Sequence, residues 1–114
     1  MDAQLKELEE EIGKVPLIVK KWAEEDPELK DWVASMDKLI WKDGKLSRQT
    51  KKIIAICVAA ALRDRHAVRA QAAGASSLGV DYDEVEEALR VTFLLAGMPA
   101  YTYGRTAIDD LMKK

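Results

Sequence analysis

Residues 53–62 read IIAICVAAAL, the longest uninterrupted apolar run in the chain, and this stretch decides the fold. Ser47 lies shortly before the run and is a good helix N-cap, so the run is predicted to be helical. Because it is apolar on every side, we expect this helix to be buried on nearly all of its faces. Alanines remain frequent as far as Ala75, and such small side chains let neighbouring helices approach closely. The run is therefore expected to form the centre of the fold, and it covers only about half a membrane span.

Helix start and stop signals recur along the rest of the chain. Asp26, Asp64 and Asp81 are each placed to cap a helix, and Glu84 would complete a capping box with Asp81. Gly79 is expected to end the helix that starts at Asp64, in the left-handed conformation. The other expected boundaries are Asp2, Gly13, Pro16, the pair Asp43-Gly44, Gly97 and Pro99. Together these signals predict an all-α fold of six or seven helices with short connections.

The composition is that of one soluble domain covering residues 1–114, which we expect to be cytoplasmic. Eighteen basic and twenty acidic residues give a net charge of −2, which argues against nucleic acid and anionic membranes as partners. The lone cysteine, Cys57, excludes an intramolecular disulfide and a multi-cysteine metal site. No metal-ligand spacing and no glycine-rich phosphate loop is present, so neither a metal nor another cofactor is expected.

Two features predict how the outer helices pack. Trp32 lies in register with Leu29 and Val33 on one apolar stripe, which predicts a place in the core. Trp41 falls just beyond that stripe and is a candidate for contact with a partner subunit. Gly104 interrupts the last helix, which indicates close packing against another backbone. The remaining members of the stripe are Met36, Leu39 and Ile40.

Four short motifs resemble those of one protein family. They are GKLS at 44–47 followed by KKIIA at 51–55, GVDYDEVEEAL at 79–89, GMPA at 97–100, and DPEL at 26–29. In this order and spacing they resemble the carboxymuconolactone decarboxylase and alkyl hydroperoxidase D-like proteins, over most of the chain from about Val15 onward. The resemblance implies an alkyl hydroperoxidase D-like helical bundle that forms a homo-oligomer, a trimer or a hexamer, with sites near subunit interfaces.

The same resemblance shows where the chain departs from the redox members of the family. Those members carry a glutamate on the core helix, a Cys-x-x-Cys pair and a later histidine. In the cysteine pair, one thiolate attacks a peroxide and the second thiol resolves the resulting sulfenic acid. Counted back from Gly79, the cysteine positions fall on Asp64 and Ala67, the histidine on Gln71 and the glutamate on Lys52. None of the four matches, so thiol peroxidase activity by the family route is not expected.

The candidate catalytic residues are the site-equivalent Lys52, Asp64 and Gln71 together with His66, the only imidazole in the chain. His66 beside Asp64 and Lys52 would support proton transfer in a remodelled pocket. The interpretation that we favour is instead an exposed histidine in an arginine-rich turn. That turn would bind a small anion or, as we rate slightly higher, pair with acids of a neighbouring subunit. Its arginines are Arg63, Arg65 and Arg69.

Hypotheses of different classes remain open from the sequence. The first is a noncatalytic or ligand-binding oligomeric protein whose reactive site was lost, by natural divergence or by engineering. The second is an enzyme with altered chemistry, a cofactor-free decarboxylase or lyase that uses His66. A third and weaker hypothesis is residual peroxide reduction through Cys57, which is more readily explained as an inert core thiol because free cysteines are commonly buried.

Overall fold

The computed structural model of the protein describes residues 3–12 and 17–112, and within these ranges it contains seven helices and no strand. The all-α prediction is confirmed. The predicted boundary residues Asp2, Gly13 and Pro16 lie outside the described residues. The helices are α1 (Ala3–Ile12), α2 (Leu17–Glu25), α3 (Pro27–Trp41), α4 (Arg48–Ala61), α5 (Arg65–Ser77), α6 (Tyr82–Ala96) and α7 (Met98–Met112). No helix in the described part of the chain is both long and apolar enough to cross a membrane.

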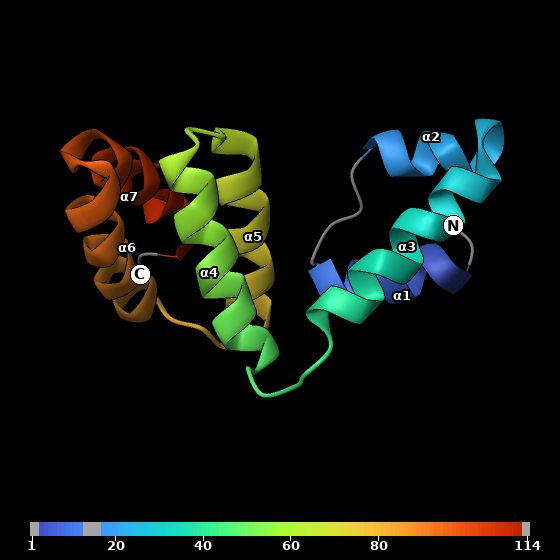
Figure 1. Ribbon diagram of the computed structural model, residues 1–114, viewed down its shortest axis with the longest axis horizontal. Helices are drawn as coiled ribbons and strands as arrows, with labels where there is room; N and C mark the ends of the chain where they lie inside the picture. The colour runs from blue at the N-terminus through green and yellow to red at the C-terminus, as the bar shows by residue number, and fades with distance from the viewer. Residues whose placement is uncertain (1–2, 13–16, 113–114) are drawn as a thin grey trace.

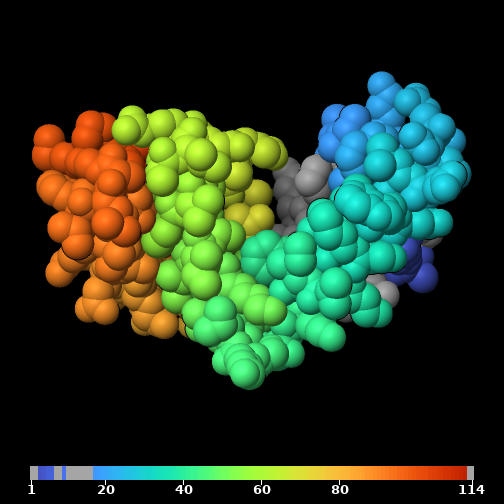
Figure 2. Space-filling model, in the orientation of Figure 1, coloured from blue at the N-terminus to red at the C-terminus, as the bar shows by residue number. Residues whose placement is uncertain are grey.

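The helices form two groups, α1–α3 and α4–α7 (Figure 1). In the space-filling view the two groups meet along α3 and α4 and separate towards the opposite edge of the molecule (Figure 2). The radius of gyration is 14.6 Å and the principal extents are 41 × 26 × 26 Å. A compact chain of this length would have a radius of gyration of about 13 Å. The arrangement is therefore somewhat extended.

The predicted N-caps are confirmed. Asp26, Ser47, Asp64 and Asp81 each accept a hydrogen bond from the backbone amide three residues later, at 3.4, 3.1, 3.0 and 2.9 Å. The Glu84 carboxylate accepts a hydrogen bond from the Asp81 backbone amide at 3.2 Å, which completes the capping box. Each cap satisfies a backbone donor that the first helical turn leaves without a partner.

The predicted break between the core helix and the next helix is also confirmed, since α4 ends at Ala61 and α5 begins at Arg65. Arg63 carries the chain through the turn with a φ of 59°. A residue with a Cβ atom in this left-handed conformation costs about 1 kcal/mol or more. The turn delivers Asp64 to the N-terminus of α5.

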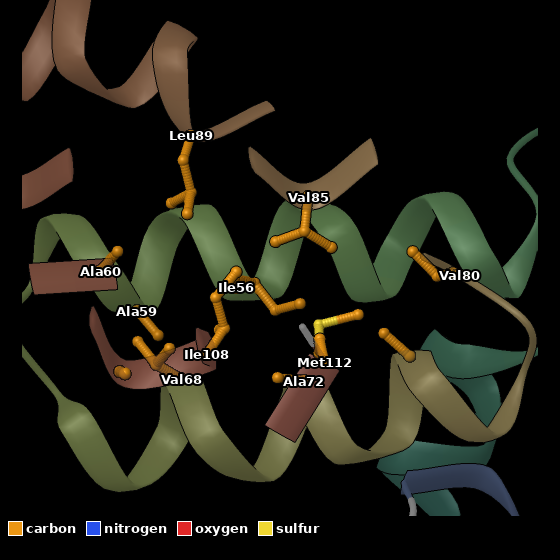
Figure 3. Packing of buried hydrophobic residues seen from close by; sticks show 12 residues of the cluster. Ile56, Ala59, Ala60, Val68, Ala72, Val80, Val85, Leu89, Ile108 and Met112 are labelled. Atoms are coloured by element: carbon orange, nitrogen blue, oxygen red, sulfur yellow. The ribbon is translucent and has the colours of Figure 1, made fainter. Parts of the chain in front are cut away.

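The main core lies among α4–α7 and combines alanines with larger aliphatic side chains (Figure 3). Ile56, Leu89 and Ile108 are fully buried at its centre. Gly104 of α7 lies where a Cβ atom would stand 2.9 Å from the Ala60 Cβ atom of α4. The close backbone approach predicted for Gly104 is therefore confirmed. The small residues of this core are Ala59, Ala60, Ala72, Ala75 and Ala107.

The prediction that the 53–62 helix is buried on nearly all faces is wrong for the chain by itself. Ile56 and Ala60 of α4 are fully buried, but Val58 is 53% and Leu62 is 74% exposed. With Ile54, which is 46% exposed, they recur every four residues and form one outward stripe. The sequence shows that every face of this helix is apolar, and the chain's own helices cover only part of it.

The core position predicted for Trp32 is wrong for the same reason. The face of α3 that packs against the rest of the chain carries Lys30 and Ala34, which are both buried. Trp32 is 64% exposed, and the stripe to which it belongs points outward. Its exposed members are Leu29, Trp32, Met36, Leu39 and Ile40. The buried hydrophobic cluster of α1–α3 consists of Leu5, Val19 and Ala34 among the described residues, with Trp22, Ala23 and Trp41 packed against them.

The contact at Gly104 yields a stability prediction. Gly104→Ala should lower the free energy of unfolding by about 1–3 kcal/mol, because the new methyl group meets Ala60 on a neighbouring helix and cannot be relieved by a side-chain rotation. Urea denaturation measures the change. Gly44→Ala is the matched control, since a Cβ atom there has no neighbour within 4 Å. Equal effects of the two substitutions would contradict the packing described here.

Candidate functional site

A recess of about 250 Å³ opens between α4 and the start of α5. Most of its lining is apolar, and its two polar side chains are Asp64 and Gln71. Its apolar lining consists of Ala55, Val58, Ala59, Leu62 and Ala67. Asp64, Ala67 and Gln71 are three of the four positions that the sequence comparison aligned with reactive residues. The fold therefore brings these positions together around one cavity.

The fourth position, Lys52, lies behind Gln71 and is fully buried. Its Nζ atom donates a hydrogen bond to Gln71 Oε1 at 3.0 Å and lies 3.8 Å from the centre of the Trp41 ring. A buried cation is costly unless its charge is compensated, and an aromatic face with a hydrogen-bond acceptor supplies part of that compensation. Through Lys52 the end of α3 is joined to α4 and α5. Trp41, a candidate for contact with a partner subunit, thus contacts Lys52 of its own chain.

Asp37 of α3 supplies a negative charge near Lys52. Burial raises the pKa of the half-buried Asp37 carboxyl above its usual value, while the charge of Lys52 and a hydrogen bond from the Trp41 side chain act to lower that pKa. The four side chains form one cluster, which we name the Lys52 cluster: Lys52, Gln71, Trp41 and Asp37. It supports the recess from behind.

His66 is not part of this arrangement. It is exposed and does not line the recess, although it lies two residues after Asp64 and five residues before Gln71. In the part of the chain that the structure describes, no hydrogen bond joins His66 to another side chain. The geometry brings Lys52, Gln71 and Asp64 together and leaves out the one side chain suited to proton transfer near neutral pH.

Cys57 is likewise outside the recess. It is half-buried on α4 and packs against the main core. Burial raises the pKa of its thiol, and a hydrogen bond with the Thr92 side chain of α6 only partly offsets this shift. A raised pKa leaves little of the reactive thiolate at neutral pH. These properties agree with the interpretation of Cys57 as a structural core residue.

The predicted arginine cluster does not act as a unit. Arg69 forms a two-pronged ion pair with Asp110 of α7, at 2.7 and 3.0 Å, and donates a further bond to the Ala107 carbonyl at 2.9 Å. This pairing lowers the pKa of the Asp110 carboxyl and raises that of Arg69. Arg69 therefore pairs with an acid of its own chain. Arg63 and Arg65 are exposed.

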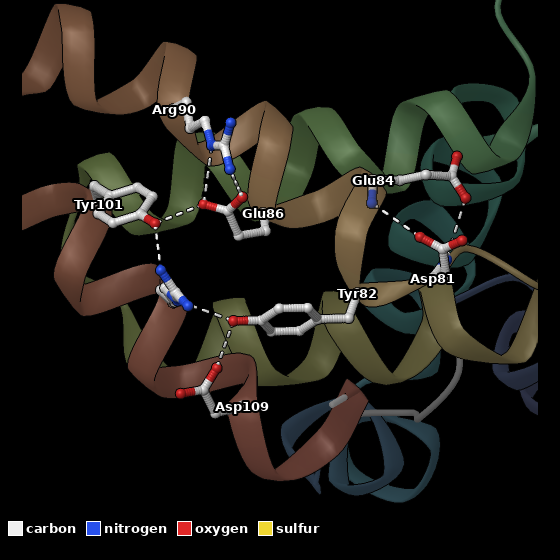
Figure 4. Close-up of polar contacts among 8 residues, drawn as sticks. Asp81, Tyr82, Glu84, Glu86, Arg90, Tyr101 and Asp109 are labelled. Carbon is white, nitrogen blue, oxygen red and sulfur yellow. Dashed lines mark hydrogen bonds and ion pairs between the residues drawn. The ribbon is translucent and has the colours of Figure 1, made fainter. Parts of the chain in front are cut away.

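A second polar cluster, which the sequence reading missed, joins α6 to α7 (Figure 4). Arg105 donates to the hydroxyl oxygens of Tyr82 and Tyr101, at 2.9 and 2.8 Å. Tyr82 in turn donates to Asp109 at 2.9 Å, and Tyr101 donates to Glu86 at 2.5 Å. The pKa of the Glu86 carboxyl lies below its usual value, mainly because of its hydrogen bond with Arg90 and next because of its hydrogen bond with Tyr101. The four-residue spacings of Glu86 to Arg90 and Tyr101 to Arg105 were the available sequence signal.

Among the described residues, no group of three or more histidine, cysteine or acidic side chains is placed to hold a metal ion. The polar side chains that line the recess are one carboxylate and one carboxamide. Such a pair can bind and orient a small molecule by hydrogen bonds, but it contains no nucleophilic thiol or imidazole.

Comparison with known proteins gives consistent results. Residues 27–110 match the carboxymuconolactone decarboxylase family. Two uncharacterized proteins of Methanocaldococcus jannaschii are similar in sequence. MJ0742 is 32% identical over 89 residues, which cover 77% of this chain and 86% of that protein, and MJ1511 is 28% identical over 85 residues, which cover 75% and 79%. The crystal structure of a proposed carboxymuconolactone decarboxylase from Burkholderia xenovorans LB400 superimposes with a TM-score of 0.79 and 25% identity, over 90% of this chain and 81% of that one.

The Lys52 cluster yields a prediction about pH dependence. Lys52→Met should lower the free energy of unfolding by about 1–3 kcal/mol at neutral pH, because Gln71 and Asp37 lose a partner. Since the pKa of Asp37 is raised in the folded state, its stabilising contribution is present at low pH and is lost as the pH rises through that pKa. Removing Lys52 raises the pKa further, so the deficit of the variant should be smaller at about pH 4 than at about pH 7.

Urea denaturation of the unsubstituted protein and of Lys52→Met, at about pH 4 and at about pH 7, measures the deficit in unfolding free energy at each pH. The double variant Asp37→Asn/Lys52→Met is the control, because it lacks the titrating group and should show nearly the same deficit at both pH values. A deficit of Lys52→Met that is equally large in acid and at neutral pH would show that Asp37 does not respond to Lys52.

Proposed function

Since the chain belongs to the carboxymuconolactone decarboxylase family, we propose that it is an oligomeric member that binds a small molecule and has no thiol peroxidase activity. One observation carries this proposal. The positions aligned with the reactive residues of redox members converge on a recess, and there they carry Asp64, Ala67 and Gln71 with Lys52 behind. The place for a ligand is kept, while the groups for thiol chemistry are replaced.

Peroxide reduction by the family route needs a thiolate that attacks the peroxide and a second thiol that resolves the sulfenic acid. Asp64 and Ala67 supply neither, and Gln71 does not exchange protons near neutral pH. Cys57 is the sole cysteine, and it packs half-buried against the main core with a raised pKa. Its position also argues against residual peroxide reduction. The alternative of a decarboxylase or lyase that uses His66 draws no support from the geometry, because His66 lies outside the recess.

The exposed apolar faces support assembly with further copies of the chain. The outward stripe of α4 comprises Ile54, Val58 and Leu62, and the end of α6 exposes Leu94 and Leu95 by 80% and 82%. Apolar surfaces of this kind mark interaction sites in proteins that fold by themselves. Val58 and Leu62 also line the recess. A second copy seated on the α4 stripe would therefore lie at the edge of the recess.

The absence of thiol chemistry can be tested directly. With hydrogen peroxide or cumene hydroperoxide and dithiothreitol as the reductant, the protein should consume peroxide no faster than its Cys57→Ser variant. The rate of peroxide loss is the measurement, and a family member with both cysteines is the positive control. Turnover that disappears on substitution of Cys57 would overturn this part of the proposal.

Assembly can be tested by placing a charge on the apolar faces. Val58→Asp and Leu94→Asp should each raise the dissociation constant of the assembly about tenfold or more. Burying an unpaired carboxylate in an interface is costly, so each variant should contain more of the smaller species. Sedimentation equilibrium measures the shift. Leu46→Asp is the matched control, since Leu46 is an exposed leucine in the loop between α3 and α4, outside both faces. Unchanged assembly of both face variants would contradict the proposed interfaces.

A further inference from the structure

The polar groups of the recess also indicate which chemical class of ligand it takes, an inference that rests on the proposed function. Gln71 is decisive because its amide has one acceptor end and one donor end. The Lys52 ammonium can only donate, so the amide must turn its Oε1 atom to Lys52, as the 3.0 Å contact shows. The amide nitrogen is then directed away from Lys52. Gln71 lines the recess, and its amide is the side-chain group there that can offer N–H donors to a ligand.

Asp64 supplies the opposite hydrogen-bonding character. One oxygen of its carboxylate, Oδ1, accepts the amide of Ala67 at 3.0 Å and caps α5. Within the described residues, no protein donor is bonded to the second oxygen, Oδ2. Asp64 also lines the recess, so this oxygen is an acceptor with a negative charge at its edge. A carboxylate accepts hydrogen bonds and attracts cations, and it repels an anionic ligand.

The nearby cationic side chains do not reverse this preference. Lys52 is fully buried behind Gln71, and its positive charge interacts with the face of the Trp41 ring and with the Asp37 carboxyl. Arg69 is paired with Asp110. Arg63 and Arg65 are exposed and do not line the recess, so water and salt screen them. Of the charged side chains in this region, only that of Asp64 forms part of the recess wall.

We propose that the recess binds a small amine: an ammonium group pairs with Asp64, an acceptor oxygen on the ligand meets the amide of Gln71, and an apolar body contacts Val58 and Leu62. The volume of about 250 Å³ suits a molecule of one ring and a short side chain, which is smaller than a drug-sized ligand. This is the reverse of an anion site, which the arginine-rich turn first suggested.

Three probes of one shape and different charge test the assignment. Phenylethanolamine carries an ammonium group, phenylethanediol is its neutral counterpart and mandelate is its anionic counterpart. Titrations of the whole ¹⁵N-labelled protein follow the amide signals of residues 55–71. Phenylethanolamine should shift the signals of the recess and bind about fivefold more tightly than phenylethanediol, with mandelate the weakest, since one exposed charge pair contributes about 1 kcal/mol.

The variant Asp64→Asn removes the charge but keeps a good N-cap, so the fold should be retained. It should weaken binding of phenylethanolamine about fivefold and abolish the preference over phenylethanediol. Asp81→Asn is the matched control, because the Asp81 side chain also caps a helix, α6, but does not line the recess. Binding of phenylethanolamine to the recess should be unchanged in this variant. A charge effect of equal size in both variants would overturn the role of Asp64.

The other outcomes separate this inference from the proposed function. If phenylethanediol or mandelate shifts the recess signals as strongly as phenylethanolamine, the recess binds small molecules but the amine assignment is wrong. If none of the three probes shifts the signals of residues 55–71, both the amine assignment and the small-molecule site are wrong.

Discussion

The close approach of α4 and α7 is the constraint on which the rest of the structure depends. At Gly104 the two helices come so near that even one methyl group would stand 2.9 Å from the Cβ atom of Ala60. Helices that pack through alanine and glycine bury little apolar area per residue, because small side chains have little to bury. The larger apolar side chains of the same helices, Val58 and Leu62 among them, are left on the outer surface. A tight core and an apolar exterior are two results of one arrangement.

The recess follows from the same geometry. The turn at Arg63 separates α4 from α5 and places Asp64 opposite the outer stripe of α4. Behind it, the buried Lys52 fixes the orientation of the Gln71 amide through one hydrogen bond. Trp41 extends this support to α3, whose contact with the main core is otherwise slight. The positions that correspond to the cysteines of redox members thus carry Asp64 and Ala67, while Lys52 and Gln71 stand at the glutamate and histidine positions.

Much of the fold could be predicted because its signals are local. Asp26, Ser47, Asp64 and Asp81 act within one helical turn, and their caps are where the sequence places them. The exposure of Trp32 could not be predicted. Periodicity shows that one face of a helix is apolar, but it does not show whether the same chain or another copy covers that face.

The candidate site was predictable only in part. Counting back from Gly79 by the family pattern assigned Lys52, Asp64 and Gln71 to one site, and the structure places them together. The partners of Lys52 and Arg69 were not predictable, because Trp41 and Asp110 reach them through tertiary packing that has no local sequence pattern. His66 attracted attention as the only imidazole, yet residue type alone does not show which way a side chain faces.

We propose that further copies of the chain cover the apolar faces of α4 and α6. The most direct test is the mass of the unsubstituted protein in solution, measured by sedimentation equilibrium over a wide dilution series. The account predicts one defined assembly, a trimer or a hexamer, that persists at low micromolar concentration. A folded monomer at every concentration, with these faces exposed to water, would contradict it.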